Sequence, residues 1–246
     1  MTRVAAISDV HGNPAAIEAV LGEVERERPD AIVFGGDLVS GPFPRETLEL
    51  LRPLRNAYYV RGNGDRDIVA ALEGGQSRGT SSAWVAQQLT DEDRDFLAAF
   101  RDTVVLDVDG LGETLFCHGS PRSDEEVITH LTPDDRLQEF LAGTDQRVVV
   151  CGHTHMQFER ESDGTRVLNA GSVGMPYQGR RGAFWLLLGP EPDFRRTDYD
   201  VDALVERMRG TDYPDADDLA IILERPYDPD AVAAFFEGIG PEPQPP

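Results

Sequence analysis

Five short apolar segments, each followed within two residues by a side chain that can bind a metal ion, constrain the fold of this chain most. Three of them lie in the first quarter of the sequence, at 3–8, 31–35 and 57–61, and helical patterns at 14–28 and 45–54 separate them. Short apolar strands that alternate with helices are typical of a parallel sheet covered on both faces. The carboxyl ends of such strands share one edge of the sheet, and ligands bind at that edge.

Strand patterns resume beyond the middle of the chain, and there they indicate antiparallel pairing as well. A turn at Asp163-Gly164 joins two of these patterns into a hairpin. The later strand patterns cover 103–110, 113–117, 147–151, 156–162, 165–170, 182–189 and 193–200. Further helical patterns cover 80–89, 90–100, 134–143, 201–210, 215–226 and 229–238. The sequence therefore predicts an α/β fold of two stacked sheets with helices outside.

The chain length predicts one domain. With 246 residues the chain buries a sizeable core, and we expect residues 1–240 to form a single unit. Within it, 200–240 is expected to be a C-terminal helical extension that serves packing. The proline-rich end, 241–246, is predicted to be a disordered tail.

The charge balance excludes several classes of partner. There are 45 acidic and 23 basic residues, which gives a net charge of −22. Such a surface repels phosphate backbones and anionic lipid, so we expect neither nonspecific nucleic-acid binding nor membrane binding. A small phosphorylated substrate remains compatible, because bound cations invert the field inside a cleft. All basic residues are arginine, so a Schiff-base lysine is excluded.

Cysteine content and apolar runs predict the compartment. Only Cys117 and Cys151 occur, which fits a reducing environment, and we interpret both as buried, inert thiols. The sequence shows no signal peptide and no apolar run of membrane-spanning length. We therefore expect a cytoplasmic protein, and a homo-oligomer is left open.

The polar residues that follow the five segments form a candidate metal site. A single histidine after a strand is more often a structural residue than a ligand, but here every segment delivers an oxygen or nitrogen ligand to the same edge. Imidazole and carboxylate ligands without thiolate, too many for one tetrahedral ion, indicate two ions. The candidate metal ligands are Asp9, His11, Asp37, Asn63, His118, His153 and His155.

The ligands divide naturally between two ions if one carboxylate bridges them, and Asp37 is the candidate bridge. One ion would take Asp9, His11, Asp37 and His155; the other would take Asp37, Asn63, His118 and His153. Two such ions activate a bridging hydroxide and stabilise the oxygens of an in-line displacement. Asp37, Asn63 and His118 are therefore predicted to act in catalysis through the ions, with Asn63 also contacting substrate.

The order of the motifs DVHG, GGD, GN-x-D, HG and GHTH resembles that of the calcineurin-like metallophosphoesterases, most closely the small bacterial phosphodiesterase-type members. The resemblance covers Arg3 to about Gly189. It implies a four-layer α/β/β/α sandwich of two mixed sheets with a dinuclear site between them. The implied ions are manganese first, with iron, zinc or nickel as alternatives. The implied activity is hydrolysis of a phosphodiester or phosphomonoester.

One position departs from the family pattern, which reads Gly-Asn-His followed by an acidic residue. Here Gly64 replaces the histidine that the family uses near the leaving group, and Asp65 keeps the acidic position as loop structure or a helix N-cap. Proton donation would then fall to a metal-bound water, or the leaving group would need none. The alternative to an enzyme is a non-catalytic scaffold or assembly protein on the same fold. The complete ligand set favours the enzyme.

Three weaker candidates lie close to these motifs. Arg122 follows His118 and could bind a phosphate through both guanidinium nitrogens, or it could be a surface residue paired with Asp124 or Glu125. Asn169 and Ser172, in a loop that the resemblance places beside the site, are interpreted as turn residues.

Overall fold

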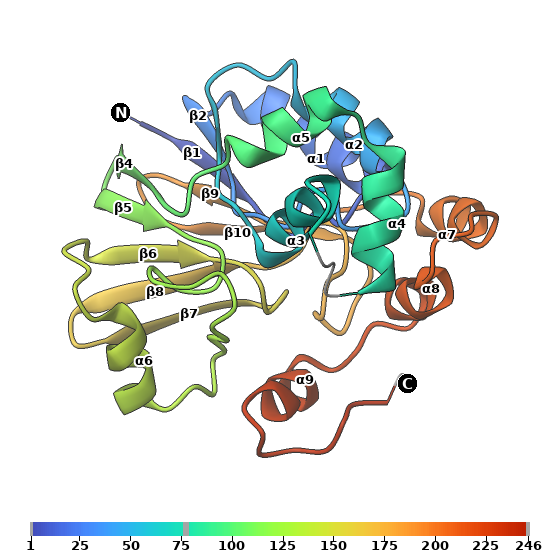
Figure 1. Ribbon diagram of the computed structural model, residues 1–246. Helices are drawn as coiled ribbons and strands as arrows, with labels where there is room; N and C mark the ends of the chain where they lie inside the picture. The colour runs from blue at the N-terminus through green and yellow to red at the C-terminus, as the bar shows by residue number, and fades with distance from the viewer. Residues whose placement is uncertain (1, 76–78, 245–246) are drawn as a thin grey trace.

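The computed structural model describes residues 2–75 and 79–244, and these form two five-stranded sheets packed face to face (Figure 1). The strand order is β10-β9-β1-β2-β3 in the first sheet and β4-β5-β6-β8-β7 in the second. The strands are β1 Val4–Ile7, β2 Ala31–Phe34, β3 Ala57–Tyr59, β4 Val104–Val108, β5 Gly112–Phe116, β6 Val148–Cys151, β7 Gln157–Ser162, β8 Thr165–Ala170, β9 Ala183–Leu188 and β10 Asp193–Thr197.

Both sheets are mixed. In the first sheet β1, β2 and β3 are parallel, whereas β9 pairs antiparallel with β1 on one side and with the edge strand β10 on the other. In the second sheet β5, β6 and β8 are parallel, and β4 and β7 pair antiparallel at the two edges. The hairpin between β7 and β8 turns at Asp163-Gly164, where both residues have positive φ. The predicted two-sheet architecture is confirmed.

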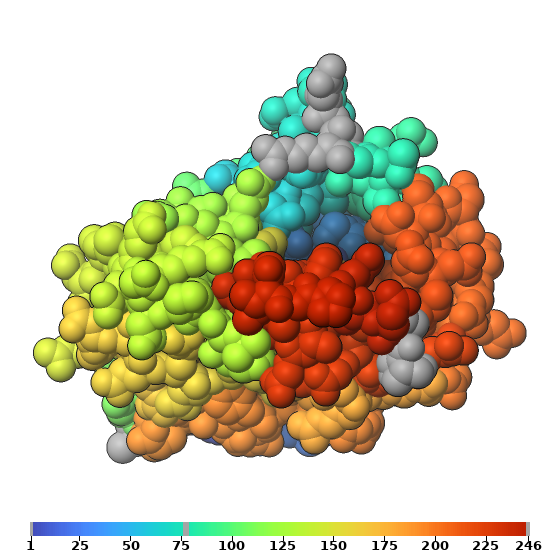
Figure 2. Space-filling model, turned by 90° about the horizontal axis from the view of Figure 1, so that it is seen from below, coloured from blue at the N-terminus to red at the C-terminus, as the bar shows by residue number. Residues whose placement is uncertain are grey.

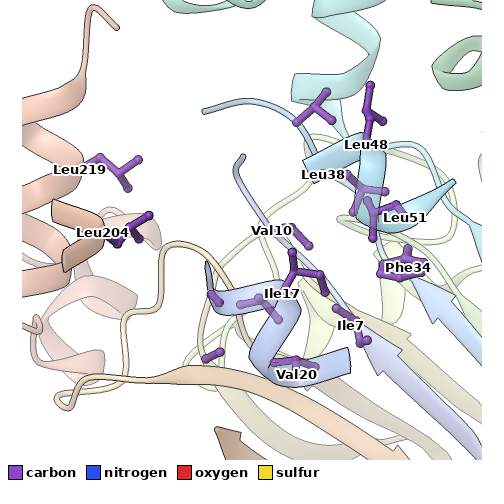
Figure 3. Close-up of a cluster of buried hydrophobic side chains, with 14 of the residues drawn as sticks. Ile7, Val10, Ile17, Val20, Phe34, Leu38, Leu48, Leu51, Leu204 and Leu219 are labelled. Carbon is purple, nitrogen blue, oxygen red and sulfur yellow. The ribbon is translucent and has the colours of Figure 1, made fainter. Parts of the chain in front are cut away.

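Buried side chains divide the molecule into four layers. Val33 of the first sheet and Val150 of the second belong to one cluster, which fills the space between the sheets. The outer face of the first sheet is covered by helices α1 (Pro14–Glu27) and α2 (Pro44–Leu51), whose Ile17 and Leu48 belong to the largest cluster (Figure 3). Helix α6 (Asp134–Leu141) covers the outer face of the second sheet through Leu137. This is the predicted α/β/β/α sandwich.

Nine helices lie within the described residues. They are α1 Pro14–Glu27, α2 Pro44–Leu51, α3 Asn63–Leu72, α4 Thr80–Gln88, α5 Asp91–Ala98, α6 Asp134–Leu141, α7 Val201–Arg209, α8 Ala216–Glu224 and α9 Pro229–Phe236. Thr90 and Asp93 close a capping box at the start of α5. No helical pattern was assigned to the residues of α3, although a helix N-cap at Asp65 was one of the two interpretations of its polar first turn.

The C-terminal helices α7, α8 and α9 lie along one side of the sandwich (Figure 1). Leu204 of α7 and Leu219 of α8 belong to the same cluster as Val10 and Ile17 (Figure 3). Helix α9 packs through Val232 on Met156, which follows β6. In the predicted disordered tail, 241–244 has no regular secondary structure, and 245–246 lies outside the described residues.

Within 2–75 and 79–244, no helix combines the length and the apolar character that a membrane crossing needs.

Candidate metal centre

The structure brings all seven predicted ligands together at the ends of strands from both sheets. Each side chain approaches another member of the set within 4.0 Å or less. Asp9 and His11 follow β1, Asp37 follows β2, Asn63 begins α3, His118 follows β5, and His153 and His155 follow β6. Parallel strands from each sheet therefore carry their carboxyl ends to a common point, as the strand order requires.

One half of the centre lies around Asp9. Its Oδ1 atom is 3.1 Å from Nε2 of His155 and 3.8 Å from Nε2 of His11. The two imidazole Nε2 atoms are themselves 3.1 Å apart. These three residues form one of two groups whose ligand atoms lie close enough to share an ion.

The other half lies around His118. Its Nε2 atom is 3.1 Å from Oδ1 of Asn63 and 3.2 Å from Nδ1 of His153. A second group of close ligand atoms contains Asp9, Asp37 and His118, so Asp9 contributes to both groups. Asp37 lies between the halves: its Oδ2 atom is 3.7 Å from His118 Nε2 and 4.0 Å from His11 Nε2. This position fits a carboxylate shared by two ions.

The hydrogen bonds around the imidazoles fit a bound cation. Nδ1 of His11, His118 and His155 faces the backbone oxygens of Ser40, Gly35 and Met175 at 3.1, 2.8 and 2.8 Å. Nδ1 must therefore carry the proton, which leaves each Nε2 lone pair directed into the centre. Lone pairs only 3.1 Å apart repel one another unless a cation or a proton lies between them.

An unsatisfied oxygen supports the same conclusion. Asp9 Oδ2 accepts hydrogen bonds from Ser8 Oγ at 2.5 Å and from the His153 backbone N–H at 3.0 Å. Its Oδ1 atom is buried and has no hydrogen-bond partner among the described residues. Buried carboxylate oxygens are seldom left without a partner, and this one faces two imidazoles that present lone pairs. The donor set of imidazole, carboxylate and amide thus fits divalent ions of the Mn, Fe, Zn or Ni type.

Backbone strain is concentrated in the same residues. Eight non-glycine residues within the described part of the chain have positive φ, and five of them are candidate ligands. The five are Asp9, His11, Asp37, His153 and His155, with φ between 48° and 66°. Left-handed backbone at non-glycine residues costs free energy and persists where the surrounding structure enforces it, often at functional sites.

Burial and neighbouring charges set the protonation of the centre. Burial lowers the pKa of His11, and His155 lowers it further. Burial and the adjacent His118 lower the pKa of His153 to about 4. Burial acts to raise the pKa of Asp9, but the neighbouring histidines, His155 first, outweigh it, so the net pKa lies well below the usual range. Neutral imidazoles beside ionised carboxylates are the forms that bind metal ions.

The pKa values of His118 and of the two cysteine thiols are raised. Burial acts to lower the pKa of His118, but Asp37 and Asp9 outweigh it and the net pKa is raised. Both cysteines are buried and free, and burial raises the pKa of Cys151 to about 12 and that of Cys117 well above its usual value. Their side chains pack with helix α6.

Asp65 organises the loop that carries Asp37, a role that the sequence indicated only in part. It lies at the third position of α3, is fully buried, and accepts a hydrogen bond from the Gly62 N–H at 3.1 Å, which makes it part of a helix cap. It also accepts from the N–H groups of Asp37 and Leu38 at 2.8 and 2.9 Å. Burial and the Asp37 carboxylate raise the pKa of Asp65 to about 7.

The close approach of neighbouring atoms explains why position 64 is a glycine. A Cβ atom there would lie 2.7 Å from Ser40 Oγ and 2.9 Å from Asp37 Oδ1. The Gly64 N–H also donates to Asp37 Oδ1 at 2.7 Å. A side chain at this position would therefore press on the carboxylate that lies between the two halves of the centre. Gly62 is tighter still, since a Cβ atom would approach the Asp37 backbone nitrogen to 2.3 Å.

Two residues interpreted as turn residues hold the ligand loops in place. Asn169 Nδ2 donates to the backbone oxygen of Gly152 at 2.7 Å, directly before His153. Ser172 Oγ donates to the backbone oxygen of Asp9 at 2.8 Å. Both are fully buried, and each also accepts a backbone N–H of its own loop, from Gly171 to Asn169 Oδ1 at 2.8 Å and from Met175 to Ser172 Oγ at 2.7 Å, so they are turn residues that also support the centre. A buried polar residue beside a ligand motif is the signal that could have indicated this role.

Arg122 lies beside the centre, but its ion-pair partners differ from those considered in the sequence analysis. Its guanidinium contacts Glu126 at 2.7 Å and Glu139 at 3.0 Å, so the pairing with Asp124 or Glu125 is wrong. Arg66 contacts both of those carboxylates instead, because helix α3 brings it there. Arg61, Arg66, Arg122 and His118 line a cavity of about 300 Å³.

Two mixed sheets with imidazole and carboxylate ligands gathered at their strand ends define a metallophosphoesterase architecture. The chain belongs to the calcineurin-like phosphoesterase superfamily, since the profile of the calcineurin-like phosphoesterase superfamily domain matches residues 2–188.

Three similar proteins extend over most of the chain. A metallophosphoesterase from Sphaerobacter thermophilus has a crystal structure that matches with a TM-score of 0.72 and 28% identity, over 89% of this chain and 98% of that one. A hypothetical protein from Pyrococcus horikoshii OT3 shares the fold with a TM-score of 0.78 and 20% identity, over 91% and 98% of the two chains. An uncharacterized protein of Methanocaldococcus jannaschii is 28% identical over 228 residues, which is 83% of this chain and 91% of that protein.

Proposed function

We propose that this protein hydrolyses a phosphodiester or phosphomonoester with two divalent ions held by the seven candidate ligands, manganese being the first candidate. The observation that carries the proposal is the position of the Asp9 carboxylate: its Oδ1 atom faces the Nε2 atoms of His155 and His11, and the same residue belongs to a second group of close ligand atoms with Asp37 and His118. Such a donor set, buried and fixed before any ligand arrives, is suited to binding cations that contact a phosphoryl group.

When bound, the ions activate water as the nucleophile and stabilise charge on the phosphoryl oxygens. The protein holds the metal-ligating side chains in fixed orientations. The carbonyl oxygens of Ser40, Gly35 and Met175 fix the imidazole orientations, and the Gly64 N–H fixes Asp37 Oδ1. Pre-set donors need no reorganisation during the reaction, which favours electrostatic stabilisation of the transition state.

Helix α3 contributes to substrate binding in this proposal. Asn63 is its first residue and lines the cavity that also contains His11 and Asp37. The N-terminal end of a helix carries partial positive charge, which favours a phosphate beside Asn63. Gly64 offers no proton to the leaving group, so esters of weakly basic alcohols, such as aryl esters, are expected to react best.

The test is hydrolysis of bis(p-nitrophenyl) phosphate and p-nitrophenyl phosphate by purified protein before and after treatment with a chelator. We expect chelated protein to lose turnover of the better substrate and added Mn²⁺ to restore it, because in this proposal the ions activate the water and stabilise the charge on the phosphoryl oxygens. Release of p-nitrophenolate is followed by absorbance. Turnover that survives complete chelation, or metal-loaded protein inactive on a wide panel of phosphoesters, would refute the proposal.

A further inference from the structure

The C-terminal helical segment forms one wall of the cavity that leads to the metal centre. A cavity of about 370 Å³ is lined on one side by His11, Asp37 and Asn63. Its other side is formed by residues at and just before helix α8, including Asp218 and Ile222. Figure 2 shows the corresponding hollow, with blue N-terminal residues visible behind the red C-terminal segment. The C-terminal segment 200–240, which was expected only to pack, thus lines the cavity beside the candidate metal centre.

An aromatic pocket of about 160 Å³ lies next to this cavity, and Ile222 lines both. Tyr177, Tyr227 and Phe236 surround the pocket. The ring of Tyr177 is 6.0 Å from that of Tyr227 and 6.1 Å from that of Phe236, both in edge-to-face arrangements. On its other side Tyr177 stacks on the candidate ligand His155, with ring centres 5.3 Å apart. The pocket is therefore joined to the metal centre through one stacked pair.

Helix α9 is anchored, so the aromatic pocket exists before any ligand binds. Glu237, at the end of α9, accepts hydrogen bonds from Thr129 Oγ1 at 2.8 Å and from Thr132 Oγ1. Its carboxylate is also 3.1 Å from Arg136, and its side chain is only 3% exposed. His130 contacts Asp230 at 2.9 Å on the same helix. Pre-formed pockets retain affinity that a mobile segment would lose to ordering.

Charge differs between the two sides of the metal centre. The cavity beyond His118 is lined by three arginines and two aspartates, which are Arg61, Arg66, Arg122, Asp102 and Asp124. The cavity beside α8 has Asp215 and Asp218 in its wall and no arginine among its described lining residues. Carboxylates repel a further phosphate and accept hydrogen bonds from hydroxyl groups. The α8 side therefore suits a neutral group that carries hydroxyls, and the aromatic pocket beyond it suits a flat ring.

We propose that the α8 cavity and the aromatic pocket together bind a nucleoside-like group of the phosphoester. The sugar hydroxyls lie against Asp215 and Asp218, and the base stacks between Tyr227 and Phe236. This inference rests on the proposed phosphoesterase function, because the ester phosphate must lie at the metal centre for the base to reach the pocket. It makes the C-terminal helices determinants of substrate specificity.

Two esters with the same leaving group test the inference. Thymidine 5′-p-nitrophenyl phosphate and methyl p-nitrophenyl phosphate both release p-nitrophenol, so the ratio of their kcat/KM values measures the contribution of the nucleoside. We expect a ratio of about tenfold or more with the Mn²⁺-loaded protein, since aromatic stacking of one base is worth about that factor. A wild-type ratio near one overturns the inference.

Substitutions in the aromatic pocket test whether the nucleoside preference arises there. Tyr227→Leu and, independently, Phe236→Leu are expected to lower the ratio about tenfold, because the base loses its stacking partner. Phe194→Leu, on the exposed face of edge strand β10, is the matched control and leaves the ratio at its wild-type value. An unchanged ratio in both pocket variants, or an equal drop for both esters, contradicts the inference.

Binding separates this inference from the proposed function. Calorimetric titration of the Mn²⁺-loaded protein with thymidine 5′-monophosphate and with methyl phosphate needs no turnover. We expect the nucleotide to bind about tenfold more tightly or better. Tight nucleotide binding without hydrolysis of any ester would refute the phosphoesterase function and keep the nucleoside site. Hydrolysis of the esters together with equal binding of thymidine 5′-monophosphate and methyl phosphate would keep the phosphoesterase function and refute the nucleoside site.

Discussion

Replacing Asp37 with alanine is expected to lower kcat/KM for an aryl phosphodiester by about 10³-fold or more in the presence of Mn²⁺. The Asp37 Oδ2 atom lies 3.7 Å from His118 Nε2 and 4.0 Å from His11 Nε2, so it faces both halves of the centre. Removing it takes a ligand from both proposed ions at once. Steady-state kinetics with saturating metal measure the loss, and His118→Ala is expected to act in the same way.

An exposed aspartate provides the control for this substitution. Asp107 lies on edge strand β4, paired with Glu113 of β5 and far from the ligand loops in the fold. Asp107→Ala should keep wild-type turnover, because surface substitutions of this kind change stability by only about 0.5 kcal/mol. Near-normal turnover by Asp37→Ala would show that the shared-carboxylate arrangement is wrong.

Replacing Asp65 with alanine is expected to destabilise the protein by about 3 kcal/mol or more and to weaken metal binding. The Asp65 carboxylate accepts three backbone N–H groups, from Gly62, Asp37 and Leu38. Each buried donor left without an acceptor costs about 1–3 kcal/mol. Two of these donors belong to the loop that positions the Asp37 side chain. Denaturant unfolding with and without Mn²⁺ measures both effects.

Asp93 gives a closely matched comparison. It holds the same third position in helix α5 that Asp65 holds in α3, and both carboxylates accept a hydrogen bond from the backbone N–H of the residue that caps their helix. Asp93 accepts from the Thr90 N–H at 2.7 Å but from no residue of the metal centre. Asp93→Ala should cost about 1 kcal/mol, the usual value of a lost cap, and should retain metal binding and turnover. Equal losses in the two variants would mean that Asp65 is only a cap.

The strand ends and their polar residues could be predicted because the information is local. A buried strand needs four or five apolar residues, and the first polar residue beyond it marks the sheet edge. The strands before Asp9, Asp37, His118 and His153 end in buried residues, so these ligands could be placed together before any coordinates were known, whereas β3, which precedes Asn63, is short and has no buried residue. The two-sheet architecture followed from the change from alternating helices and strands to hairpins.

Other features depend on contacts between distant segments and were missed. Helix α3 begins in a polar turn, and its first turn is stabilised by Asp65 together with the loop after β2. The absence of a side chain at Gly64 was interpreted only as a lost proton donor, whereas Ser40, 24 positions earlier, occupies the adjacent space. The partners of Arg122 and the contact of α8 with the metal cavity likewise depend on packing that no local pattern encodes.

The number of ions bound per chain tests the central claim most directly. Metal-free protein is reconstituted with Mn²⁺, the bound metal is measured by mass spectrometry, and phosphodiester turnover is recorded at each loading. Two divalent ions in one centre predict saturation at about two per chain. They also predict that turnover rises mainly as the second ion binds. Full turnover with one ion per chain, or with none, would contradict the dinuclear centre.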